Sequence, residues 1–150
     1  AGTVLLSVLL LCTLALSAGA ASKLRVGVKF WKTGSDKESM ANSGIDTSRE
    51  ASLTRQSNGT YTLTLPIQQV SKMGVTGYLT GLTIGDVTYN GTLTGDFNKA
   101  TAVLTIKNLP ASVLTGSDVN KALTVTCNIQ MDLSLLGEIN TSARMCIWNK

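Results

Sequence analysis

The feature that most constrains this 150-residue chain is a period of two in its apolar residues from residue 23 onward. In the segment 23–31, KLRVGVKFW, the side chains of Leu24, Val26 and Val28 alternate with charged or small residues. Successive side chains of a β-strand point to opposite faces, whereas a helix brings residues three or four apart onto one face. The alternation therefore predicts half-buried strands.

Turn residues divide the chain into short strands. Asn58-Gly59 lies between two alternating segments, 51–55 and 61–70, and predicts a type I′ hairpin turn, in which both central residues have positive φ. Asn90-Gly91 predicts another turn. Further strands are expected at 77–85, 86–90, 100–109, 121–133 and 143–149. The series predicts an all-β fold, an immunoglobulin-like antiparallel β-sandwich of about eight strands, with helical turns only within 36–46 and 110–121.

The chain opens with an apolar segment, VLLSVLLLCTLAL at 4–16, followed by small residues. With Ala18 and Ala20 in an A-x-A arrangement, it is typical of a secretory signal peptide cleaved after Ala20. It is short for a membrane span, which needs about 20 apolar residues; an uncleaved N-terminal anchor is the alternative. We expect 1–20 to be a signal peptide or anchor and 21–150 to be one domain, secreted or held at the cell surface. The missing initiator Met indicates that the chain begins inside its reading frame.

Several functional classes are excluded by what the chain lacks. The sequence holds no His, which removes the usual general base and most zinc sites. Its 9 carboxylates include no closely spaced pair of the glycosidase kind, so an enzyme is not expected. The net charge of +4 comes without a basic helix, and no nucleic acid is expected as a partner. We expect the protein to contact a membrane only through an uncleaved N-terminal segment.

Two cysteines, Cys127 and Cys146, remain after the predicted cleavage. In an exported protein they form a disulfide or stay as buried free thiols, and the sequence leaves both open. If 122–132 and 142–149 form the last hairpin with Cys127 opposite Cys146, the two sulfurs lie near each other. Trp148 then joins the face of Cys127, and the opposite face must be covered by something. That outer face carries Ala143, Met145 and Ile147.

The methionines after the signal segment have different surroundings. Met40 lies in a polar loop, DKESMANSGID at 36–46, which has no evident need for an apolar side chain. Met131 continues the apolar face of its strand and is expected to fill the core, a role that suits a flexible thioether. Met73 opens a strand, and its facing is left open.

Two long segments carry a family resemblance: KFWKTGSDKESMANSGID at 29–46 and ASLTRQSNGTYTLTLPIQQVSKMGVTGYLTGLTIG at 51–85. They resemble the NEAT-type haem-binding domains of Gram-positive surface proteins. The similarity extends over 23–150, is most specific in ESMAN, and is closest to the Shp haem-binding family. It implies an immunoglobulin-like sandwich that holds one haem at its edge, between a short helical turn and the last β-hairpin.

The resemblance also implies which residues contact the haem. Met40 would cover one face of the porphyrin, and Ser39 or Asn42 would meet a propionate. NEAT domains usually carry a Y-x-x-x-Y motif on the last hairpin; this chain lacks it, and its tyrosines lie elsewhere, at Tyr61, Tyr78 and Tyr89. The Shp branch uses two methionine thioethers, which implies Met40 and Met145 as axial iron ligands. The other implied residues are Ala143 and Ile147 beside the haem and Met73 as a reserve ligand.

Two functions are compatible with this sequence. Two neutral thioethers favour ferrous iron and leave no open position for oxygen chemistry. The resemblance thus implies a protein of iron acquisition that carries haem and exchanges it with haem-donor or haem-acceptor surface proteins. The alternative is an immunoglobulin-like adhesion or protein-interaction module without a cofactor.

Overall fold

The computed structural model describes residues 22–72, 74–132 and 137–150. The predicted signal segment, 1–20, and Met73 lie outside the described residues. Within the described part of the chain, no helix is long and apolar enough to cross a bilayer.

The described residues form nine strands and four short 3₁₀-helices. The strands are β1 (Ser22–Trp31), β2 (Ala51–Arg55), β3 (Tyr61–Pro66), β4 (Val70–Lys72), β5 (Val75–Ile84), β6 (Val87–Thr94), β7 (Val103–Leu109), β8 (Leu123–Met131) and β9 (Glu138–Asn149). The 3₁₀-helices are η1 (Met40–Gly44), η2 (Phe97–Lys99), η3 (Ala111–Val113) and η4 (Val119–Lys121). Three of them, η1, η3 and η4, lie in the two segments where helical turns were predicted. The fourth, η2, lies outside both segments, so the prediction that helical turns occur only there is wrong.

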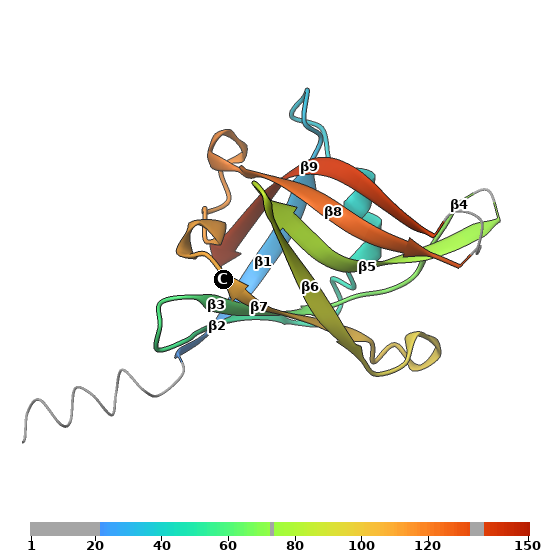
Figure 1. Ribbon diagram of the computed structural model, residues 1–150, viewed down its shortest axis with the longest axis horizontal. Coiled ribbons are helices and arrows are strands. Elements are labelled where there is room, and N and C mark those ends of the chain that lie inside the picture. Colours follow the sequence, from blue (N-terminus) through green and yellow to red (C-terminus); the bar gives the residue numbers. More distant parts are fainter. Residues whose placement is uncertain (1–21, 73, 133–136) are drawn as a thin grey trace, which may run out of the picture.

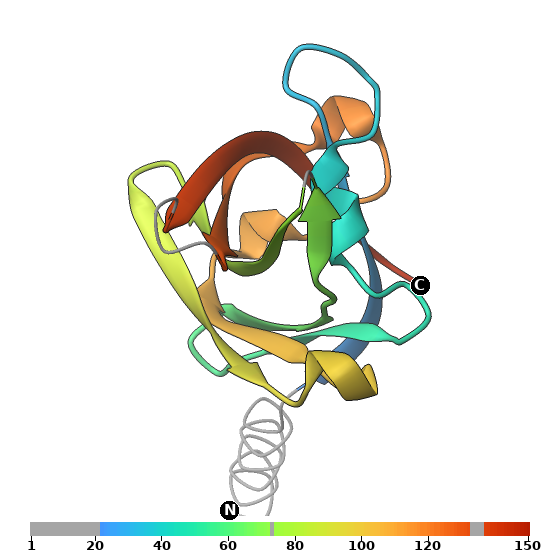
Figure 2. The same cartoon turned by 90° about the vertical axis from the view of Figure 1, so that its right-hand side faces the viewer.

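The strands pair antiparallel and close into a barrel (Figures 1 and 2). The strand order is β4-β5-β6-β7-β3-β2-β1-β9-β8, and β8 also pairs with β5. The antiparallel all-β prediction is confirmed, but the sheet closes instead of leaving two separate sheets. Closure is possible because β5, which is 10 residues long, pairs with β4 and β6 along one edge and with β8 along the other. A bulge between Leu79 and Gly81 lets β5 follow the curve of the wall.

The last hairpin has a different register from the predicted one. Cys127 pairs with Thr141 instead of Cys146. The shift is an odd number of residues, so it exchanges the two faces of β9. The prediction of an outward face is therefore wrong, and the register that forms is the one that buries three apolar side chains. Those side chains, each 0% exposed inside the barrel, are Ala143, Met145 and Ile147.

The Asn58-Gly59 hairpin turn is confirmed, but its type is not I′. Of the two residues only Gly59 has a positive φ, +85°. The Asn58 side chain instead accepts a hydrogen bond from the Thr60 N–H at 3.1 Å. The loop is closed by the Gln56 N–H, which donates to the Thr60 carbonyl at 2.8 Å.

The turn predicted at Asn90-Gly91 is wrong, because both residues lie inside β6. The chain turns earlier, at Gly85, where φ is +60°. The glycine at position 91 leaves space for a neighbouring side chain and does not form a turn. A β-carbon at this position would collide with the Leu104 side chain.

Aliphatic side chains from all sides of the barrel fill its interior. The largest buried side chains are Phe30, Leu53, Leu63, Leu65, Ile67, Leu82, Leu104, Ile106, Leu109, Met145 and Ile147. Cys127 belongs to the same cluster. Cys146 is also buried, but it faces outward from the barrel, and its thiol donates to the Asp118 carbonyl at 3.4 Å.

The helix η1 is held against β1 by side-chain hydrogen bonds. The Asn42 Oδ1 accepts from the Phe30 N–H, and the Asn42 Nδ2 donates to the Phe30 carbonyl, both at 2.7 Å. The amide thus supplies the pair of bonds that a neighbouring strand would supply. Ser39 is the N-cap, and its buried Oγ accepts from the Ala41 N–H at 3.2 Å. Two residues of the ESMAN segment therefore fix the backbone that carries Met40.

The chain that follows η1 is anchored by Arg49. Its Nε donates to Asp46 at 2.7 Å, and its Nη2 donates to the Ala102 carbonyl at 2.8 Å. Hydrogen bonds from the Ser48 side chain and then from Arg49 hold the pKa of Asp46 below its ordinary value of 3.8.

We expect Asn42→Ala to lower the free energy of unfolding by about 2 to 3 kcal/mol, because it leaves the Phe30 N–H without its side-chain acceptor. Urea denaturation measures the change. The matched control is Asn149→Ala at an exposed position, which should cost less than about 0.5 kcal/mol. Equal losses in the two variants would contradict the role of Asn42.

The Asp46→Asn variant should be less stable than the wild type at neutral pH by about 1 to 2 kcal/mol. A carboxyl whose pKa is lowered on folding stabilises the protein above its unfolded-state pKa. That contribution is lost as the pH falls through the folded-state value. The stability gap between variant and wild type should therefore narrow in acid. Denaturation curves at a series of pH values test this, and a gap that stays constant would refute it.

Cys127 and Cys146 are free thiols in the structure, and the prediction that they lie close together is wrong because of the register. Burial raises the pKa of Cys127 to about 12. Because both thiols are buried, a thiol reagent should react with neither of them in the folded protein. In denaturant without reductant both thiols should react, and a count of zero there would contradict the free-thiol state.

Candidate functional site

A groove lies at one end of the barrel, bordered by η1, β4, the start of β5 and the β8–β9 hairpin. Figure 2 shows η1 and β4 side by side at this end, and the Gln68 N–H between them donates to the Gly44 carbonyl at 3.0 Å. The groove has a volume of about 270 Å³. Its lining residues are Met40, Ala41, Gly44, Val70, Val75, Gly77, Tyr78, Leu79, Ile129, Met131, Ile139 and Thr141.

The floor of the groove is a continuation of the core. On β8, Val125 and Cys127 point into the barrel and are buried. Two and four residues further along the same face, Ile129 and Met131 line the groove. Because the hairpin extends beyond the point where the barrel interior is filled, one apolar strand face serves first as core and then as groove floor.

Among the residues that the structure describes, none that lines the groove carries a charged side chain. The lining residues with polar side chains are Tyr78 and Thr141. Two apolar side chains at the groove stay open to solvent, Met40 at 58% and Ile139 at 40% exposure. Exposed apolar side chains that border a groove are typical of a surface that binds a ligand or a partner.

Two thioethers enter this groove from different elements. Met40 comes from η1, and Met131 comes from the end of β8. Thioether sulfur is a soft ligand that suits iron in haem and copper(I). The groove thus combines apolar walls with two soft donors.

The structure brings together only part of the predicted set. Met40 lines the groove. Met145 does not, because its side chain is fully buried in the barrel core. Ser39 and Asn42 are engaged in holding η1 and are absent from the lining. Ala143 and Ile147 are core residues.

Met131 is the groove residue that sequence reasoning placed in the core. The sequence pattern correctly predicted the face of β8 on which Met131 lies, since Met131 shares the apolar face of Val125 and Cys127. What the pattern did not show is where along β8 the barrel ends. In the structure Met131 is only partly buried and lines the groove.

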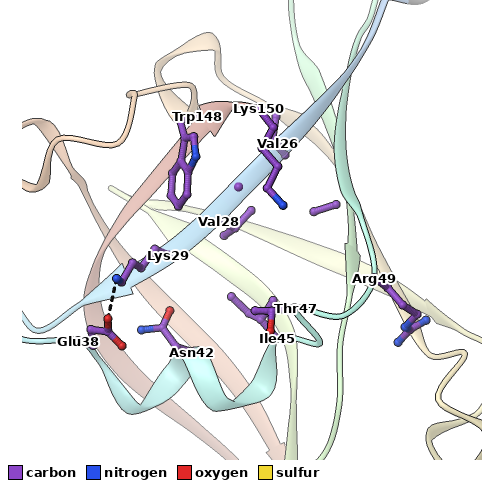
Figure 3. Close-up of a pocket in the computed structure, with 12 residues that line it drawn as sticks. Val26, Val28, Lys29, Glu38, Asn42, Ile45, Thr47, Arg49, Trp148 and Lys150 are labelled. Carbon is purple, nitrogen blue, oxygen red and sulfur yellow. Dashed lines mark ion pairs between the residues drawn. The ribbon is translucent and has the colours of Figure 1, made fainter.

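A second cavity, of about 320 Å³, lies where β1 separates from β2 (Figure 3). Trp148 packs over Gly27 at its wall, and Asn42 and Ile45 reach it from the η1 segment. Its three cations already have partners: Lys29 pairs with Glu38 at 2.6 Å, Arg49 with Asp46 at 2.7 Å, and Lys150 with Glu50 at 3.4 Å. Since no unpaired charge or converging donor set distinguishes this cavity, the groove with two thioethers is the better candidate site.

Comparison with known proteins identifies the fold. No model of a protein family matches the sequence. No curated protein matches it either. Among solved structures, the NEAT5 domain of IsdX2, a B. anthracis hemophore in complex with heme, has a TM-score of 0.52 with this chain. The two are 10% identical, over 86% of this chain and 97% of that one.

A mutant of the same IsdX2 domain, also in complex with heme, gives the same TM-score of 0.52. It is 12% identical to this chain, and the match covers 86% of this chain and 96% of that one. Sequence identity at this level establishes the fold and not the ligand. The chain therefore has the fold of a NEAT domain.

Proposed function

We propose that this protein is an exported haem-binding domain that carries haem in the groove between η1 and the β8–β9 hairpin. The observation that supports it best is a groove lined by both Met40 and Met131, with no charged side chain among the described residues that line it. A porphyrin needs apolar walls and a few placed polar groups, and this lining offers both. The solved domains of the same fold are themselves haem complexes.

Met40 and Met131 are the candidate axial ligands. They come from different elements that line the groove, η1 and the end of β8, whereas Met145, which the resemblance to the Shp branch implied, lies in the core. Two soft, neutral ligands would favour ferrous iron and leave no coordination position for oxygen. These properties suit a carrier and not a catalyst.

The propionates are expected to lie at the mouth of the groove. No cation lines its interior in the described part of the chain, and a buried carboxylate without a partner is costly. Ser39 and Asn42 are unsuited to this contact because their polar atoms already bond to the η1 and β1 backbones. We therefore expect propionates to be solvated instead of held by these two side chains.

Transfer of haem to or from another surface protein is part of the proposal. Met40 is 58% exposed, so one wall of the groove is accessible to a partner while the other belongs to the rigid barrel. Export and a location at the cell surface rest on the signal segment 1–20, which lies outside the described residues.

The alternative is a protein-interaction module without a cofactor. The exposure of Met40 and Ile139 is the observation that favours it, because an apolar rim also suits a protein partner. A haem-binding measurement distinguishes the haem carrier from the protein-interaction module.

Titration of the purified protein with hemin, followed by reduction, should give a Soret band and sharp low-spin visible bands. Met40→Leu and Met131→Leu keep the side-chain volume but remove the sulfur. Each should abolish the low-spin bands and weaken haem affinity by about 10- to 100-fold, the range found when groups that support a metal site are removed.

The matched control is Met145→Leu, which makes the same chemical change inside the core. It should leave the spectrum as in the wild type. Loss of the low-spin bands in Met145→Leu but not in Met131→Leu would contradict the ligand assignment. If the wild type gives no Soret band, the protein-interaction module becomes the better proposal.

A further inference from the structure

Gly77 lies in the interior of β5, directly across the β5–β8 ladder from Met131. A glycine inside a strand loses more conformational freedom on folding than other residues and often marks a place where another group approaches closely. The φ of Gly77 is not positive, so the backbone conformation does not require glycine here. The reason for the glycine must therefore be space.

The space beside Gly77 is filled by the Met131 thioether. A β-carbon built at Gly77 would lie 2.7 Å from the Met131 Sδ, 3.1 Å from the Gln130 carbonyl oxygen and 3.3 Å from the Ile129 Cγ2. The shortest of these distances is far inside van der Waals contact. The sulfur of Met131 is thus seated where the side chain of residue 77 would otherwise be.

The backbone of Met131 cannot move away to relieve such a contact. Its N–H donates to the Gly137 carbonyl at 2.9 Å, across the hairpin. Its carbonyl accepts from the Gln130 Nε2 at 3.2 Å. The next residue, Asp132, donates its N–H to the Thr76 carbonyl on β5 at 2.8 Å. With the backbone fixed on both sides, an added methyl group would displace the flexible thioether.

We propose that Gly77 is a positioning residue of the groove: it seats the Met131 sulfur flat against β5, at the groove floor. This role rests on the proposed function, and it deepens it by explaining how one thioether is held. A methyl group at residue 77 would push the sulfur toward the groove space, where it would narrow the groove and lose its orientation for a ligand. Gly77 acts through Met131 and need not touch the haem.

The test uses Gly77→Ala, with Gly34→Ala as the matched control. A β-carbon at Gly34 meets nothing within 4 Å, and Gly34 lies in the exposed loop that precedes η1. In the protein without haem, with carbon-13 labelled methionine methyl groups, Gly77→Ala should shift the Met131 methyl resonance and leave that of Met145 in place. With hemin and reductant, Gly77→Ala should lose the low-spin bands that Gly34→Ala retains.

A double variant shows whether Gly77 acts through Met131. In a Met131→Ala background, adding Gly77→Ala should change the haem spectrum no further. If Gly77→Ala alone fails to fold, Met131→Ala should restore folding by removing the displaced side chain, and failure to do so would overturn the proposal. An unchanged Met131 resonance would also overturn it. Absence of a Soret band in the wild type would refute the proposed function, whereas a Soret band that stays low-spin in Gly77→Ala would refute only the role of Gly77.

Discussion

The pairing of β8 with β5 along one edge and with β9 along the other is the constraint on which the rest of the structure depends. Without it, β5 and β8 would be open edges with unpaired backbone groups, which invite association with other chains. With it, the wall closes around the aliphatic core. The same pairing continues past the core, so the end of β8 becomes the floor of the groove.

The strands were predictable from the sequence because alternation is a local property. The segments at Leu24, Tyr61 and Leu123 each show the pattern within a few residues, and the structure has strands at all of them. Closure was not predictable, since it depends on which distant strands meet. The turn type at Asn58 was also missed, because the side-chain hydrogen bond to Thr60 competes with the backbone conformation that the Asn-Gly pair favours.

The predicted register of the last hairpin was wrong because the correct register depends on the tertiary structure. β9 is apolar on both faces, so the pattern alone could not show which face meets the core. The outward face carries Cys146, and the segment before η4 covers it through the Asp118 carbonyl. A sequence pattern does not show which loop folds over which strand. The error moved Met145 to the surface in the prediction.

The candidate site was predictable in part. Met40 was identified because a polar loop offers no local use for its side chain, and the groove supplies that use. Met131 was missed because a strand face looks the same in sequence whether it lies over a core or beyond it. Apolar periodicity gives the direction of a side chain, but only the assembled barrel shows what lies in that direction.

The hydrogen bonds of Asn42 to Phe30 have a mechanical consequence. Phe30 pairs with Met145 on β9, and the other end of β9 carries Ile139, which lines the groove. Two borders of the groove, η1 and the start of β9, are therefore connected through the paired strands β1 and β9. The groove is established when the barrel folds, so a ligand that enters it does not have to order either border.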